Sequence, residues 1–220
     1  MISFLKNNCE NEWLEIIEHY KETFSFKKGD TIIHSGEELK GIYFVEKGKA
    51  KVMLAIGKDE NRIIRLVSDG DILGQRGFGL DKVHPTSIEA LSDIKVIFIP
   101  LKTFELVLKT NVKLTYQMMM LFADELKRSE QTMYNLSAEG RVARSIWSNY
   151  RAFGGDINEN YTLLSFTLSR NDLSNMSNTT YATTIRTLKK LESDGLIKLI
   201  GKEIALTNKD KLRERFIHYL

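Results

Sequence analysis

The spacing of apolar residues divides the chain into a β-rich first half and a helical second half. Residues 11–20 have apolar positions at helical spacing, which predicts a short amphipathic helix. From Phe24 the period changes to two, and short β-rich runs alternate with turns of Gly, Asp and Ser. These runs are 31–34, 41–45, 50–54, 63–67, 87–91 and 95–100. Strands at roughly ten-residue intervals, without long helices between them, predict a closed jelly-roll-like β structure and not a dinucleotide-binding sheet.

After Pro100 the pattern becomes helical. Residues 101–109 form a short predicted helix, and Asn111 is placed to cap a much longer one. In that longer helix, apolar positions follow each other at alternating spacings of three and four, as the seam of a coiled-coil dimer requires. The seam consists of Met119, Phe122, Leu126, Ser129, Met133 and Leu136. The alternative is a long helix packed on its own β domain, which also accommodates the run Met118-Met119-Met120.

The segment 137–140 is predicted to separate two modules. A helix containing Val142, Ile146, Trp147 and Tyr150 follows it, ends at Phe153-Gly154-Gly155 and leads into a polar loop that runs to Asn160.

The region 169–206 has the most informative pattern. Ser169 and Asp172 resemble a capping box at the start of a short helix, and Asn178 lies in the tight turn after it. Either Thr179 or Thr180 caps a second helix, which ends at Gly195. The predicted buried stripe of this helix is Ala182, Ile185, Leu188 and Leu191. Strands 197–200 and 204–206 then form a wing.

This order of elements predicts a winged helix-turn-helix: a short helix, a tight turn, an amphipathic helix and a β wing. The second helix of such a module enters the major groove of DNA. The candidates for base contacts are Thr180, Tyr181, Thr183, Thr184 and Arg186. The candidates for phosphate contacts are Ser169, Arg170, Lys189 and Lys202. The Arg186 side chain can donate two hydrogen bonds to guanine, and Thr and Tyr side chains can contact thymine methyl groups. The alternative is a winged-helix module that makes only protein contacts.

Composition and charge agree with two modules. The chain has 220 residues, 42% of them hydrophobic, which is too apolar for a disordered chain. Its net charge of +3 is unevenly distributed, because residues 141–220 carry 13 Lys and Arg against 8 Asp and Glu, a net +5, and the first 140 residues carry a net −2. The C-terminal part is therefore the better candidate to meet a polyanion.

The single cysteine and the lack of a long apolar stretch limit the classes of protein. Cys9 alone cannot form an intramolecular disulfide or an all-cysteine metal or iron–sulfur site. The sequence has no run of about 20 apolar residues and no apolar signal segment at its start. We therefore expect a cytoplasmic protein without membrane contact, metal or cofactor.

In the order and spacing of its motifs, the chain resembles the bacterial cyclic-AMP receptor and fumarate–nitrate regulator (Crp/Fnr) family of transcription factors. The motifs are TIIHSGE (31–37), GIYFVEKG (41–48), GDILG (70–74), GRVA (140–143), LSRNDL (168–173), TTIRTLKKLE (183–192) and GLI (195–197). The resemblance implies an α+β protein with a double-stranded β-helix (jelly-roll) effector domain at 1–110, a dimerisation helix at 111–139 and a DNA-binding domain at 140–220.

The resemblance also implies the partners. Family members are two-fold dimers that read near-palindromic operators, respond to a small-molecule effector and contact RNA polymerase when they activate transcription. In a dimer, two recognition helices lie about 34 Å apart, one turn of DNA.

The effector-pocket candidates depart from the cyclic-AMP-binding pattern. That pattern has a Gly-Glu pair, an Arg-Ser or Arg-Thr pair and a Thr-Ser pair on the dimer helix. This chain has Gly74-Gln75, Pro85-Thr86 and Leu126-Lys127 at the matching positions. Because Pro85 lacks the charge and donors that a phosphate needs, we expect no tight binding of a cyclic nucleotide. Arg62, Arg65 or Arg76 could replace the missing Arg as the partner of a phosphate; the alternative is that each is a surface residue.

Three other functions remain open at this point. His34 or His84 is the candidate ligand if the protein senses with haem, although a lone His is commonly an ordinary turn or core residue. A cupin-like enzyme would need clustered His ligands, and the four His residues show no such spacing. A ligand-independent regulator would use the roll only as a dimer scaffold.

Overall fold

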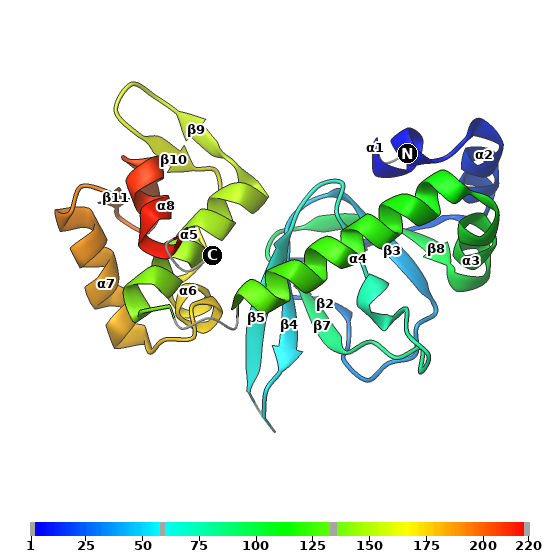
Figure 1. Cartoon of the computed structure of the whole chain (residues 1–220), viewed down its shortest axis with the longest axis horizontal. Coiled ribbons are helices and arrows are strands. Elements are labelled where there is room, and N and C mark those ends of the chain that lie inside the picture. The colour runs from blue at the N-terminus through cyan, green and yellow to red at the C-terminus, as the bar shows by residue number, and fades with distance from the viewer. Residues whose placement is uncertain (1–2, 58–59, 133–135, 218–220) are drawn as a thin grey trace. The chain divides into compact units, whose positions relative to one another are not determined.

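The computed structural model describes residues 3–57, 60–132 and 136–217, which form two compact units (Figure 1). Residues 1–61 and 67–130 make up the N-terminal module, and residues 62–66 and 131–220 make up the C-terminal module. Across the described residues, no helix has both the length and the apolarity needed to cross a membrane.

Two four-stranded sheets form the roll of the N-terminal module. The strand order of the first is β1 (Glu22–Phe26), β8 (Ile94–Pro100), β3 (Gly41–Lys47) and β6 (Ile72–Leu73). The order of the second is β2 (Thr31–Ile33), β7 (Thr86–Ala90), β4 (Ala50–Ala55) and β5 (Asn61–Val67). The six strands predicted from the alternating pattern are confirmed. β1 and the two-residue β6 were not predicted, because neither has an alternation long enough to detect.

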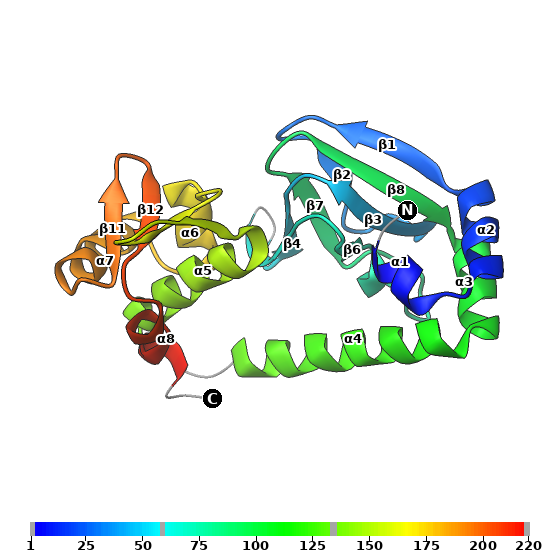
Figure 2. The ribbon, with the colours of Figure 1, turned by 90° about the horizontal axis from the view of Figure 1, so that it is seen from above.

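Three short helices close the core of this module: α1 (Ser3–Asn8), α2 (Asn11–Tyr20) and α3 (Leu101–Thr110) (Figure 2). α2 has the predicted bounds. Phe44 of β3 and Phe104 of α3 are fully buried, and their ring centroids lie 6.4 Å apart. Leu5 and Ile17 bring α1 and α2 into the same cluster, so the helices and the first sheet share one hydrophobic core.

The long helix α4 (Val112–Thr132) has two apolar faces. Asn111 caps it as predicted, since its side-chain oxygen accepts a hydrogen bond from the Leu114 amide at 2.9 Å. Leu114 and Met118 are buried in the core of the roll, and Leu121 packs against that core. The exposed apolar residues of the helix are Val112, Tyr116, Met119, Met120, Phe122 and Leu126. One face therefore packs on its own domain, as the alternative interpretation required, and a second apolar face stays exposed.

The structure corrects the C-terminal end of the predicted dimer seam. Leu136 is 7% exposed and belongs to the core of the C-terminal module, so its place in a seam is wrong. Met133 lies outside the described residues, and the side chain of Ser129 is not described. The dimerisation helix was predicted to extend to 139, but Ala138 and Glu139 already belong to the next helix.

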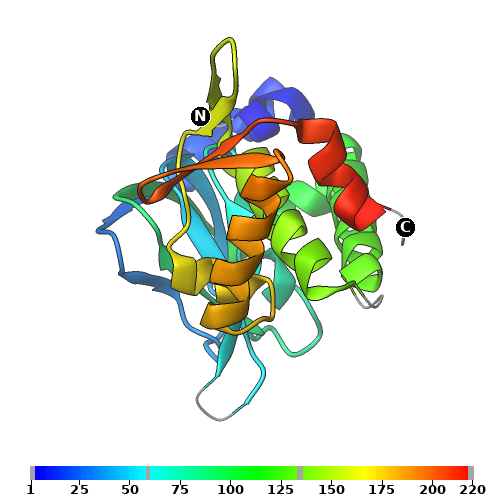
Figure 3. The ribbon, with the colours of Figure 1, turned by 90° about the vertical axis from the view of Figure 1, so that its left-hand side faces the viewer.

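Within the described residues, four helices and a small sheet form the C-terminal module, drawn from yellow-green to red in Figure 3. The helices are α5 (Ala138–Phe153), α6 (Arg170–Met176), α7 (Tyr181–Ser193) and α8 (Lys209–Ile217). The sheet order is β11 (Ile197–Ile200), β12 (Glu203–Leu206), β10 (Thr162–Leu164) and β9 (Gly155–Ile157). Val142, Leu188, Leu191 and Leu212 belong to the core that joins α5, α7 and α8.

Two predictions about this module were wrong in detail. The segment 137–140 is not a break, because Ser137 caps α5 through its side chain and Gly140 lies inside the helix. The polar loop up to Asn160 contains strand β9, which pairs with β10. α8 was not predicted at all; six of its nine residues are charged, so its apolar positions are too few to show a period.

Replacement of Phe44 by Ala tests the shared core. We expect the substitution to lower the free energy of unfolding of the N-terminal module by about 3–5 kcal/mol, because it leaves a cavity among Phe4, Phe104 and the first sheet. Urea unfolding followed by Trp13 fluorescence in a Trp147→Phe background measures it. Phe24→Ala, at a residue 38% exposed, is the control and should shift the midpoint much less. Equal shifts would contradict this account of the core.

Candidate nucleic-acid interface

The turn between α6 and α7 is set by side-chain caps and one left-handed residue. Ser169 caps α6, since its Oγ accepts a hydrogen bond from the Asp172 amide at 3.0 Å and donates one to the Asp172 carboxylate at 2.7 Å. Asn178 has φ of 49°, as predicted for the tight turn. Of the two candidates for the cap of α7, the structure selects Thr180, whose Oγ1 accepts from the Thr183 amide at 3.1 Å.

The end of α7 follows the Schellman pattern. Gly195 has φ of +68°, its amide donates to the Glu192 carbonyl, and the Leu196 amide donates to the Leu191 carbonyl. The helix therefore stops at the predicted residue, and the chain turns directly into β11.

Thr184 is wrong as a base contact. Its side chain is fully buried and its hydroxyl lies 2.7 Å from that of Thr179, which in turn lies 3.0 Å from the hydroxyl of Ser177. These three hydroxyl groups form a hydrogen-bonded chain inside the turn. Thr184 therefore fixes the start of α7 against the end of α6 and does not face solvent.

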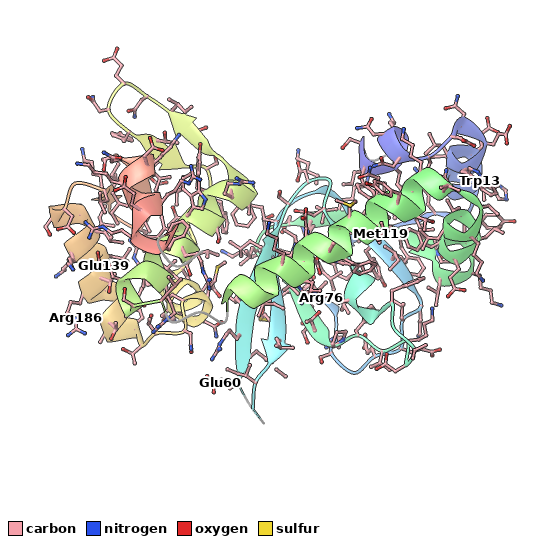
Figure 4. All side chains as sticks on the ribbon, in the orientation of Figure 1. Trp13, Glu60, Arg76, Met119, Glu139 and Arg186 are labelled. Carbon is pink, nitrogen blue, oxygen red and sulfur yellow. The ribbon has the colours of Figure 1, made fainter. Side chains whose placement is uncertain are left out.

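The exposed face at the start of α7 carries the other candidates. Thr180, Tyr181 and Arg186 are exposed, and Tyr181 retains 54% of its accessible surface. Figure 4 shows Arg186 extending outward from α7. Thr183 is half-buried, and its hydroxyl accepts a hydrogen bond from that of Thr180 at 2.9 Å.

The predicted buried stripe of α7 also needs correction. Ala182 was placed in it but is exposed, and Ile185 is only half-buried. Thr184 and Thr187 are buried beside Leu188 and Leu191, so two Thr residues complete the face that packs inward. Ala182 thus joins the exposed face, where its small side chain leaves room beside Tyr181.

A single guanidinium group supports the turn from behind. Arg141 of α5 donates from Nε to the Ser177 carbonyl at 2.9 Å, from Nη1 to the Leu136 carbonyl at 2.7 Å and from Nη2 to the Asn178 carbonyl at 3.3 Å. These carbonyls belong to the turn and to the segment before α5. The sequence assigned Arg141 no role, because two of its acceptors, Ser177 and Asn178, lie about 36 residues further along the chain.

An ion-pair cluster holds the C-terminal half of α7. Glu139 at the start of α5 lies 2.5 Å from Lys190 Nζ and 3.1 Å from Arg215 Nη1, and Arg215 Nη2 lies 3.0 Å from Asp194. Glu139 is labelled in Figure 4. The cluster joins α5, α7 and α8. Because Lys190 is held by Glu139, the basic residues of α7 left facing outward are Arg186 and Lys189.

The phosphate candidates differ in exposure. Lys189 and Lys202 are exposed, and Lys202 lies in the turn between β11 and β12. Arg170 is half-buried at the start of α6; burial lowers the pKa of its guanidinium, and the nearby Tyr181 opposes that shift. The Ser169 hydroxyl is exposed but already caps α6.

The effector-pocket candidates of the N-terminal module do not share one environment. Gly74 has φ of +84° and starts a short 3₁₀ turn, η1 (Gln75–Gly77). Gln75 and Thr86 are buried, whereas Pro85, Leu126 and Lys127 are exposed. The Gln75 side chain donates to Glu125 of α4 at 2.7 Å, a partner that the sequence comparison did not indicate.

The two haem candidates differ in exposure. His84 is buried, and burial lowers the pKa of its imidazole while the charge of Glu37 opposes the shift; His34 is exposed. Burial raises the pKa of the Cys9 thiol to about 11, partly offset by Lys113, so this cysteine is a protonated thiol at neutral pH. No group of three or more His, Cys, Asp or Glu side chains suited to a metal ion occurs among the described residues.

Sequence comparisons match both modules. Residues 23–111 fit the model of the cyclic nucleotide-binding domain, and residues 140–215 fit that of the Crp-like helix-turn-helix domain. The fumarate and nitrate reduction regulatory protein of Escherichia coli (strain K12) is 30% identical over 219 residues, which cover 97% of this chain and 85% of that protein. The protein of the same name from Salmonella typhimurium is 30% identical over 217 residues, covering 96% and 84%.

Solved structures have the same fold. FixK2 from Bradyrhizobium japonicum matches with a TM-score of 0.77 at 22% identity, covering 89% of this chain and 97% of that one. A mutant of CooA from Carboxydothermus hydrogenoformans matches with a TM-score of 0.75 at 17% identity, covering 97% and 95%. The relatives over the whole chain and the two domain matches agree: the protein belongs to the Crp/Fnr family and is a DNA-binding transcriptional regulator, not an enzyme.

Proposed function

We propose that the protein binds a near-palindromic operator as a homodimer and reads bases with the exposed start of α7. The observation that carries this proposal is the face formed by Tyr181, Ala182 and Arg186, which points outward while Arg141 and Thr184 hold the turn behind it. Arg186 reads guanine and Tyr181 contacts thymine methyl groups. Lys189 and Lys202 contact phosphates, which position the helix without reading sequence.

The exposed apolar face of α4 forms the dimer seam in this proposal. Met119 and Leu126 are 56% and 61% exposed, and Phe122 lies between them at the spacing of a coiled coil. A second copy would bury these side chains against its own and bring two heads to one operator. The seam of this proposal ends within α4, because Leu136 belongs to the C-terminal core.

The effector of the N-terminal module is a small molecule other than cyclic AMP in this proposal. Gln75 already donates to Glu125, and Pro85 offers neither charge nor donor to a cyclic phosphate. Operator binding takes place in the cytoplasm, with RNA polymerase as a further partner if the protein activates transcription. A regulator that needs no effector is the second candidate, favoured by the fact that the pocket position bonds within the chain.

Sequencing of the genomic fragments that the purified protein retains is the direct test of operator binding. We expect enrichment of one sequence with two-fold symmetry and half-sites one helical turn apart. Retention without any common sequence would contradict specific reading by α7.

Replacement of Arg186 by Ala tests the groove assignment. We expect specific binding to weaken by about 1–3 kcal/mol and the preference at one base pair of each half-site to relax, because the bidentate contact to guanine is lost. Competition binding against single-base operator variants measures both effects. An unchanged preference at every position would show that Arg186 does not enter the groove.

Replacement of Lys202 by Ala tests the wing. We expect weaker binding to all DNA sequences alike. The slope of the logarithm of the binding constant against the logarithm of the salt concentration should become shallower by about one unit per protomer, because one phosphate contact disappears. Titrations at several salt concentrations, with operator and with unrelated DNA, measure the slopes. A loss confined to the operator would mean that Lys202 contacts bases instead.

Cyclic nucleotides provide the test of the effector proposal. In isothermal calorimetry of the purified protein with cyclic AMP and cyclic GMP, we expect no binding in the micromolar range, since no cation stands at the position of Pro85. A micromolar dissociation constant for either nucleotide would overturn it.

A further inference from the structure

One face of α4 changes from apolar to acidic along the helix. Leu114, Met118 and Leu121 pack on the core of the roll, and Glu125 is the next residue at the same helical spacing. The Glu125 side chain is only 11% exposed, whereas its neighbours Asp124 and Leu126 are exposed. The N-terminal half of α4 is thus held on the roll by apolar contacts, and Glu125 extends the same face as a nearly buried carboxylate.

The turn η1 supplies two partners of this carboxylate. Gln75 is 3% exposed, and its side-chain amide donates to Glu125 Oε1 at 2.7 Å. Arg76 Nε lies 3.2 Å from Glu125 Oε2. The two consecutive residues therefore meet the two oxygens of one carboxylate, and Figure 4 labels Arg76 beside α4. A nearly buried carboxylate is stable only with such partners, because its desolvation otherwise favours the neutral acid.

The backbone of η1 packs closely against the buried His84. A Cβ added at Gly74 would come within 3.2 Å of the imidazole ring, and one added at Gly77 within 3.0 Å. Gly74 also needs its left-handed φ of +84°. The donors of Gln75 and Arg76 are therefore presented by a turn that packing already defines, and not only by the carboxylate that they contact.

We propose that Gln75 and Arg76 form a carboxylate-binding site of the roll and that Glu125 of the same chain is its resident ligand. This intramolecular ligand fixes α4 to the roll beyond the last apolar contact that the structure describes on this face. Arg76 Nε is buried and has no hydrogen-bond partner within the described part of the chain, so its contact with Glu125 is an ion pair and leaves a donor available.

The site determines what chemistry an effector would need. A small carboxylate would compete with Glu125 for the Gln75 amide and the Arg76 guanidinium, and it would release α4 when it bound. This step deepens the proposed function, because release of α4 matters for operator binding only if α4 carries the dimer seam. The site itself depends only on the contacts within the N-terminal module.

The test uses the full-length protein with Glu125→Ala and, as a matched control, Asp124→Ala at the exposed neighbouring carboxylate. Hydrogen exchange followed by mass spectrometry reports on the peptide that contains η1. We expect Glu125→Ala to speed exchange there roughly tenfold, as loss of a charged hydrogen bond would, and Asp124→Ala to leave it unchanged. Glu125→Gln, which keeps an acceptor for Gln75 but loses the charge, should fall between the two.

Chemical rescue distinguishes a binding site from a packing contact. We expect sodium acetate to slow exchange at η1 in Glu125→Ala, with sodium chloride of equal ionic strength as the control, and to have no such effect in Asp124→Ala. Equal exchange in the two Ala variants, or equal effects of acetate and chloride, would overturn the proposal. Since neither readout involves DNA, failure of operator binding would overturn the proposed function and not this site. If Glu125→Ala does not fold, the comparison of Glu125→Gln with Asp124→Ala decides.

Discussion

The helix α4 has more apolar side chains than one packed face can bury, and the proposed homodimer depends on this excess. Leu114 and Met118 face the roll, and Met119 and Leu126 remain exposed. A helix with a single apolar face buries it against its own domain and needs no further partner. A helix with a second, exposed apolar face is stabilised when another surface buries that face. The proposed dimer follows from this physical constraint.

The proposed reading face of α7 depends on polar contacts made behind it, within the C-terminal module. Arg141 donates to two carbonyls of the turn and to the Leu136 carbonyl before α5, and the hydroxyl chain from Ser177 to Thr184 fills the inside of the same turn. At the other end of the helix, Glu139 gathers Lys190 and Arg215. With both ends held, Tyr181 and Arg186 have a defined position, which specific hydrogen bonds to base edges require.

The roll shows how a family fold can keep its shape while its binding chemistry changes. Gly74 still starts its turn with a left-handed backbone, but Gln75 now meets Glu125 instead of presenting a carboxylate of its own. A carboxylate on α4 joins this helix to η1 within the module, whereas a carboxylate on the turn is available to bind a ligand.

Local patterns in the sequence determined the elements and their ends. Alternation identified six strands of the roll, helical spacing placed α2 from Asn11 to Tyr20, and Asn111, Asn178 and Gly195 marked caps and turns, because each of these signals acts over a few neighbouring residues. Motif order was enough to indicate the family and the winged helix-turn-helix. Only the tertiary structure decided which side of each element faces inward. Thr184 is buried because its hydroxyl pairs with that of Thr179, Ala182 is exposed while Thr187 faces inward, and Leu136 belongs to the C-terminal core. The contacts of Arg141 and Glu125 join residues far apart in the chain, and no local pattern encodes a partner that folding alone brings near.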